Sequence, residues 1–190
     1  MVSARKRPSY ADIQALPSHL RGEIIAGELV VHPRPAPPHV HAAGALGIFV
    51  GGPFGFGVGG PGGWWIEPEP ELSLGVDQDF DPIIPDLAGW RRERMPALPE
   101  TAQFTLVPDW VCEVLSPSTQ AIDRADKMPF YLRADVKHAW LVDPIQQTLE
   151  VFRQENGRWS ILGVHKGSAV VRAEPFDAVE LHLAQWWARA

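Results

Sequence analysis

Cysteine is almost absent from this sequence, with Cys112 the single example in 190 residues. One cysteine cannot form an intramolecular disulfide, and it cannot supply the cysteine pairs of a structural zinc site. We therefore expect the fold to be stabilised by packing, and we expect no redox chemistry.

Long apolar runs are missing too. The longest stretch without charge, 36–66, is rich in glycine and broken by proline, so it does not predict a membrane-spanning helix. The N-terminus has basic residues at 5–7 but no uninterrupted apolar segment behind them, which argues against a secretory signal. The expected location is cytoplasmic, with no membrane partner.

Positive charge is also in short supply, because 17 Lys and Arg face 23 Asp and Glu, giving a formal net charge of −6. A protein that coats nucleic acid without specificity needs a surplus of cations, so that class is disfavoured. A local basic groove and a site built from clustered carboxylates both stay open.

What is present fits one globular domain. The length of 190 residues and a hydrophobic fraction of 45% suit a single core. We expect one domain over 1–190, with an N-terminal helix and hairpin at about 9–32 packed on it.

The N-terminal segment predicts a helix and a hairpin. Ser9 can cap a short helix starting near Tyr10. Gly27 lies between two β-favouring runs, 23–26 and 28–31, where a residue that tolerates positive φ suits a tight turn.

The rest of the chain alternates strands with few helices. Apolar spacing predicts helices over 39–50 and 121–133, the second with Pro129 as an awkward interior residue. Strands are expected over 64–74, 83–90, 110–115, 138–142, 148–153 and 158–164, with a short closing helix over 183–187. This order predicts an α/β or α+β layered domain.

A glycine pattern at 55–60 matches the dinucleotide motif G-x-G-x-x-G, but we reject it. That motif needs a helix directly after the glycines, whereas Pro61 and the strand-like residues 64–66 follow here.

Two carboxylates in apolar surroundings carry the functional argument. Asp86 follows the run 83–85, and Glu113 stands among Trp, Val and Leu. A buried charge needs a partner or a cation, and carboxylates on adjacent strands suit Mg²⁺. Such an ion would acidify a water nucleophile and neutralise charge on a phosphodiester.

Lys127 is the candidate cation beside this site. It lies on the predicted helix, with Asp123 four residues before it and Tyr131 four residues after it, so all three share one face. We expect Lys127 to support the nucleophile or the transition state, with Asp123 and Tyr131 orienting it.

These residues resemble the Uma-two family of restriction-endonuclease-like proteins, within the PD-(D/E)XK nuclease superfamily. The specific part is 113–119 followed by Asp123, Lys127 and Tyr131. The resemblance extends over Tyr10, 23–31, 85–86, 108–119 and 139–144.

The resemblance implies a restriction-endonuclease-like core, a mixed sheet between helices, in which Asp86 and Glu113 bind Mg²⁺ and Mn²⁺ can substitute. It also implies the Val114 backbone carbonyl as a ligand and Glu23 near the metal or its water. The superfamily pattern places lysine two residues after the glutamate, where this chain has Leu115. The resemblance then assigns the role of this lysine to Lys127, since the Uma-two family has its lysine on the helix.

Simpler interpretations compete with these roles. Asp86 can cap a turn, and Glu113 can form a structural ion pair with Arg124 or Arg133. Lys127 and Asp123 can be an exposed helix pair.

Three further groups of residues suit surface roles as well as functional ones. His39 and His41 fit a surface or capping role or a contact with substrate. Glu67, Glu69 and Glu71 fit one solvated strand face. The arginines at 91, 92 and 94 fit either a solvated loop or a phosphate contact.

The sequence therefore supports two hypotheses. The first is a Mg²⁺-dependent DNA endonuclease acting through metal-activated water. The second is a noncatalytic protein of the same fold that binds nucleic acid or a protein partner. Eight tryptophans, including the pairs at 64–65 and 186–187, exceed what a small core readily absorbs and make a homodimer contact plausible.

Overall fold

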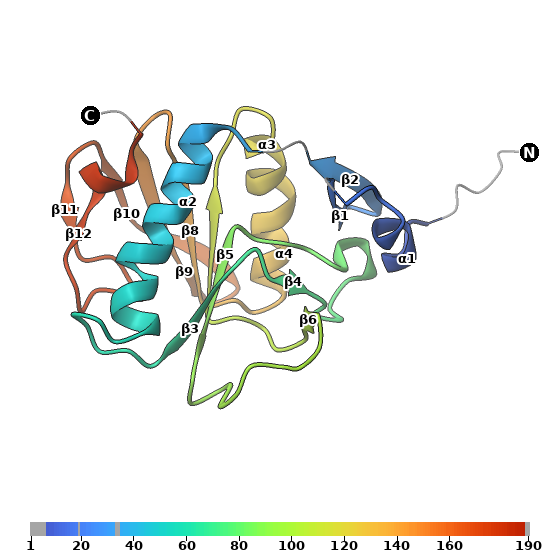
Figure 1. Cartoon of the computed structure of the whole chain (residues 1–190), viewed down its shortest axis with the longest axis horizontal. Helices are drawn as coiled ribbons and strands as arrows, with labels where there is room; N and C mark the ends of the chain where they lie inside the picture. The colour runs from blue at the N-terminus through green and yellow to red at the C-terminus, as the bar shows by residue number, and fades with distance from the viewer. Residues whose placement is uncertain (1–6, 19, 33–34, 189–190) are drawn as a thin grey trace, which may run out of the picture.

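A six-stranded mixed sheet forms the centre of the protein (Figure 1). The computed structural model describes residues 7–18, 20–32 and 35–188. The sheet order is β10-β9-β8-β7-β5-β3, and only the β7–β8 pair is parallel. Its strands are β3 (Trp64–Pro68), β5 (Leu87–Arg91), β7 (Trp110–Val114), β8 (His138–Asp143), β9 (Thr148–Glu155) and β10 (Arg158–Lys166).

Helices cover both faces of this sheet, so the expected α/β layered class is confirmed (Figure 1). One face packs on α2 (Pro37–Phe49), which continues into the π-helical turn η1 (Gly51–Gly55). The other face packs on a single helical stretch made of α3 (Gln120–Ile122), η3 (Asp123–Lys127) and α4 (Met128–Arg133).

An aromatic cluster fills the core on the α2 side. The Phe176 ring lies 4.8–5.4 Å, centroid to centroid, from the rings of Phe54, Trp64, Trp110 and Trp140. Trp186 and Trp187 are buried in the same cluster. Because this core absorbs most of the tryptophans, they no longer argue for a homodimer contact, and the homodimer stays a prediction.

The N-terminal helix α1 (Tyr10–Gln14) and the hairpin of β1 (Arg21–Ile25) and β2 (Glu28–His32) form as the sequence predicts. The two-residue turn has Ala26 at φ 50° and Gly27 at φ 75°, the positive values that twisted hairpins favour. This unit lies at one end of the molecule, at the right in Figure 1.

Backbone hydrogen bonds dock the hairpin on the following segment. The Ile24 N–H donates to the Pro82 carbonyl at 3.1 Å, and the Gly27 N–H donates to the Asp79 carbonyl at 3.0 Å. Both bonds hold the hairpin against the segment that leads into β5.

The remaining elements are short. They are β4 (Glu71–Leu72) paired in parallel with β6 (Gln103–Phe104), β11 (Val170–Val171) paired with β12 (Leu181–His182), and the 3₁₀ turns η2 (Gln78–Phe80) and η4 (Leu183–Trp186). None of the helices in the described part of the chain has the length and apolar character of a membrane span.

Three predicted elements differ from the structure. The predicted strand 64–74 is interrupted at Glu69, whose φ of 47° is incompatible with extended backbone. The predicted strand 83–90 begins only at Leu87, because 83–86 leaves the sheet to meet the hairpin. The closing helix is the 3₁₀ turn η4.

Rejection of the dinucleotide motif is confirmed, since strand β3 follows the glycines. The segment after η1 is irregular and leads directly into the sheet.

Gly89 in β5 tests this packing. A Cβ there would lie 3.0 Å from Ile66 and 3.2 Å from the Trp110 ring, so Gly89→Ala should lower the free energy of unfolding by about 1–3 kcal/mol. Gly47→Ala, on α2 with open space around it, should raise it by up to about 1 kcal/mol. Urea denaturation of both variants measures the difference, and equal effects would contradict the packing described.

Candidate active site

The candidate site lies where the start of β5 meets the end of β7. These strands are antiparallel, with Leu87 opposite Cys112, so the residues just before β5 and near the end of β7 become neighbours. Asp86 and Glu113 occupy those positions. Sheet pairing alone therefore brings together two carboxylates that are distant in sequence.

Asp86 is held from two sides. Its Oδ2 accepts the Val114 N–H at 2.6 Å, and its Oδ1 lies 3.1 Å from Nε2 of His39 on α2. The Leu115 N–H bonds to Val142 on β8, so by strand alternation the Val114 amide and carbonyl point the other way, toward Asp86. Asp86 is thus bound across the sheet end rather than capping a local turn.

Glu113 is buried on the α4 side of the sheet, at 2% exposure. Its Oε1 accepts the Tyr131 hydroxyl at 2.5 Å, and both of its oxygens lie 3.4 Å from Lys127 Nζ. Burial raises the pKa of Glu113 well above its usual value, although Lys127 opposes the shift. Glu113 pairs with neither Arg124 nor Arg133, which bind Glu150 and Asp77 instead.

Lys127 is a buried ammonium at the centre of the site. Its Nζ donates to the Ile84 carbonyl at 2.8 Å and lies 3.1 Å from Glu23 Oε1. Burial lowers the pKa of Lys127, but Glu113, Glu23, Asp123 and Asp86 outweigh burial and the net shift is upward. Lys127 is therefore a permanent cation, and the exposed-pair interpretation is wrong.

The π-helical turn η3 explains how the helix presents these groups. Pro129 has no N–H to donate to the preceding turn, and the Met128 N–H instead reaches back five residues to the Asp123 carbonyl. Asp123 and Lys127 are the two ends of this widened turn, and both are buried. The helix therefore continues through Pro129 with its polar face toward Glu113.

Asp123 lies on the same helix at 3% exposure. Burial raises its pKa from 3.8 to about 6, against the lowering effects of Lys127 and of a hydrogen bond with Thr119. At neutral pH it adds a further negative charge to the cluster.

Glu23 enters the site from the hairpin strand β1. Its Oε1 accepts the Ile84 N–H at 2.5 Å and also contacts Lys127, so one carboxylate links the hairpin to both the β5 approach and the helix. The structure thus brings together every candidate side chain: Glu23, Asp86, Glu113, Asp123, Lys127 and Tyr131.

His39 is the residue whose place the sequence left open. The start of α2 brings it to Asp86, while its buried Nδ1 has no hydrogen-bond partner among the residues that the structure describes. Burial lowers the pKa of His39, but the hydrogen bond with Asp86 and nearby carboxylates reverse the shift to a net rise. The spacing of His39 and His41 carried no sign of Asp86 as its partner.

Arg91 ends β5 and Arg92 follows it, so both lie at the end of that strand opposite Asp86. Arg92 stacks on the Trp65 ring at 4.0 Å and bonds to the Trp64 and Gly55 carbonyls. Arg91 lies over the Trp64 ring. These contacts support a structural role.

Comparison with known proteins places the chain in a family. A model of the Uma2 family, described as "Putative restriction endonuclease", matches residues 8–184, and the chain belongs to that family. No curated protein matches. A crystal structure of a "putative nuclease belonging to DUF820" from Anabaena variabilis is similar, with TM-score 0.68 and 20% identity over 94% of this chain and 96% of that one. The expected nuclease-like fold is confirmed.

Within the described residues, no three Asp, Glu, His or Cys side chains are arranged to hold a metal ion. The contacts explain why. Lys127 and Tyr131 bind the carboxylate oxygens of Glu113. Lys127 and the Ile84 N–H bind the Glu23 carboxylate.

Stability should depend on pH through Asp123. Because the folded state binds this proton more tightly than the unfolded chain, the contribution of Asp123 to stability is largest below about pH 4 and is lost as the pH rises to about 6. Asp123→Asn should therefore raise the free energy of unfolding by about 2–3 kcal/mol at pH 7.5 in EDTA, with no gain below pH 4.

Chemical denaturation across this pH range makes the measurement. Asp126→Asn, on the same turn but outside the cluster, controls for loss of a helix charge. A pH-independent effect of Asp123→Asn would contradict the assignment.

Proposed function

We propose that this protein is a Mg²⁺-dependent endonuclease that hydrolyses phosphodiester bonds in DNA. The observation that carries the proposal is the cluster of four carboxylates, three of them buried, around one buried ammonium, Lys127, at the end of the sheet. Membership in the Uma2 family, described as "Putative restriction endonuclease", supports the substrate class.

The donor set fits a hard divalent cation. All four acidic groups offer carboxylate oxygen, and one lysine leaves the cluster with excess negative charge. Asp86 and Glu113 would hold the ion, with the Val114 carbonyl as a further oxygen. When bound there, a divalent cation makes water more acidic and neutralises charge on a phosphodiester.

The protein's own groups then have separate tasks. His39 and the Val114 N–H fix the orientation of Asp86. Tyr131 does the same for Glu113. These contacts hold two acceptors in place before any ligand arrives, which reduces the cost of reorganisation.

Lys127 acts as a fixed positive charge in this proposal. Its pKa is raised, so it does not serve as a general base. Instead its ammonium stabilises the negative charge that develops on a phosphoryl oxygen during hydrolysis. Glu23 and the Ile84 carbonyl keep it aimed at the cluster.

One observation favours a second candidate, a noncatalytic protein of the same fold that binds nucleic acid or a protein. Leu115 is buried where the superfamily pattern has lysine, and Lys127 with Tyr131 already satisfies Glu113. In that case the cluster is a structural ion-pair network.

Cleavage of supercoiled plasmid DNA tests the proposal. With Mg²⁺ or Mn²⁺ the wild-type protein should nick the plasmid, and Asp86→Asn or Glu113→Gln should lower the rate by about 100-fold or more because an acceptor of the cation is lost. Glu180→Gln, an exposed carboxylate on the far side, is the matched control and should cleave normally.

Thermal unfolding with and without the ions completes this test. Ion binding to the folded state should raise the melting temperature of the wild type but not of Asp86→Asn. Absence of both cleavage and stabilisation would replace the endonuclease with the noncatalytic candidate.

A further inference from the structure

Arg21 lies at the entrance to the carboxylate cluster. It is two residues before Glu23 on β1, so both side chains leave the same face of the strand, about 7 Å apart. Glu23 points inward to Lys127, whereas the Arg21 side chain is 62% exposed. Asp86, a proposed ligand of the cation, acts electrostatically on Arg21.

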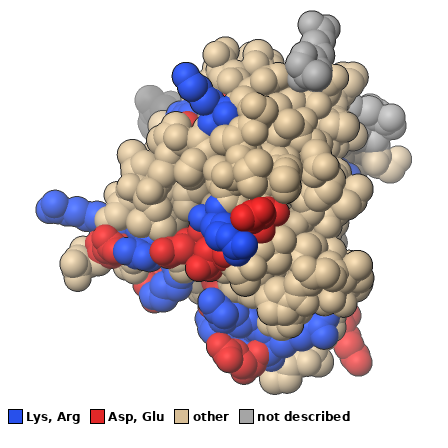
Figure 2. Space-filling view, turned by 90° about the vertical axis from the view of Figure 1, so that its left-hand side faces the viewer, with Lys and Arg blue, Asp and Glu red and all other residues tan. Residues whose placement is uncertain are grey.

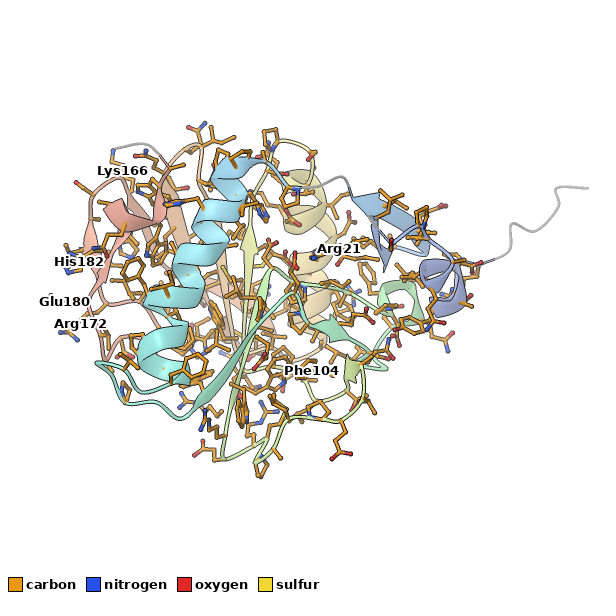
Figure 3. All side chains as sticks on the ribbon, viewed as in Figure 1. Arg21, Phe104, Lys166, Arg172, Glu180 and His182 are labelled. Carbon is orange, nitrogen blue, oxygen red and sulfur yellow. The ribbon has the colours of Figure 1, made fainter. Side chains whose placement is uncertain are left out.

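A cleft of about 290 Å³ opens at this point. Arg21 lines it together with Pro68, Glu69 and Ile84. Ile84 is the residue whose backbone binds both Glu23 and Lys127, so the cleft borders the buried site directly. Figure 3 shows Arg21 beside the middle of the molecule, between the hairpin and the sheet.

Glu69 holds Arg21 in its present position through an ion pair. The Glu69 backbone has a φ of 47°, a conformation that costs energy for a residue with a side chain, and its N–H bonds to the Asp86 carbonyl at 2.9 Å. The partner of Arg21 is therefore tied to the backbone of the site itself, and not to a remote surface.

A phosphodiester that approaches this cluster meets repulsion unless a cation balances it. Lys127 lies inside the site, where its ammonium is buried and bound by Glu23, Glu113 and the Ile84 carbonyl, so a phosphate at the entrance needs a different cation.

Arg124, an exposed arginine on the helix of the cluster, binds Glu150 and does not line this cleft. Arg21, in contrast, lines the cleft, and its partner Glu69 is bonded to the Asp86 backbone.

We propose that Arg21 binds a phosphate of the nucleic acid backbone at the entrance to the site and that Glu69 leaves Arg21 when this happens. The inference rests on the proposed function and names a residue that positions the substrate. A guanidinium suits the task because it can bind phosphate oxygens through two parallel N–H bonds.

The far side of the molecule supplies a matched control. Arg172 and Glu180 form an exposed pair there, with side-chain exposures of 54% and 56%, similar to Arg21 and Glu69 (Figure 3). Figure 2, which faces that side, shows cationic and anionic side chains mixed together without a continuous basic surface.

The experiment measures binding of a short fluorescent DNA duplex by anisotropy, in Ca²⁺ and in EDTA, over a range of salt concentrations. Arg21→Ala should weaken binding about tenfold and reduce the slope of log K against log salt by about 0.9. Arg21→Lys should restore the slope, and Arg172→Ala should match the wild type. Glu69→Gln should strengthen binding several-fold, and Glu180→Gln should not.

The outcomes separate the two proposals. If the wild type binds and cleaves DNA but Arg21→Ala behaves like Arg172→Ala, the role of Arg21 is wrong and the endonuclease stands. Weaker binding by Glu69→Gln would overturn the displacement of Glu69. A wild type that neither binds nor cleaves DNA overturns the proposed function and the role of Arg21 together.

Discussion

Burial of the Lys127 ammonium is the constraint on which the site depends. A buried cation is costly unless it is paired and hydrogen-bonded, and here the partners come from separate parts of the chain: Glu23 from the hairpin, Glu113 from β7 and a carbonyl from the β5 approach. Moving any of these elements would leave a charge unpaired in the interior. The same interaction that assembles the site therefore also docks the hairpin onto the core.

The cluster lowers the stability of the folded state, because several carboxylates share one cation. Burial raises the pKa values of Glu113 and Asp123, so ionisation of these two carboxyl groups opposes folding unless further positive charge arrives. The aromatic core around Phe176, on the opposite face of the sheet, offsets part of this cost. A second apolar cluster, which includes Phe130 and Leu141, packs on the same face as the site and contributes to stability as well.

Much of this arrangement follows from local pattern. Apolar strands containing a lone carboxylate predicted Asp86 and Glu113, and helical spacing predicted that Asp123, Lys127 and Tyr131 share a face; the structure places all five together. Local pattern does not reveal which chain segments meet at a sheet end. The contact of His39 with Asp86 and the break at Glu69 arise from tertiary contacts and backbone strain, so periodicity carried no signal for them. Pro129 predicted a disturbed helix, but it did not predict a π-helical turn whose two ends, Asp123 and Lys127, are buried.

Anomalous X-ray scattering from crystals grown with Mn²⁺ would test directly whether the cluster is a divalent-cation site. The proposed function predicts an anomalous peak in contact with the Asp86 and Glu113 carboxylates, absent from crystals of Glu113→Gln. A map with no peak at the cluster, and with Lys127 still bound to Glu23 and Glu113, would contradict it and leave these carboxylates as a structural network.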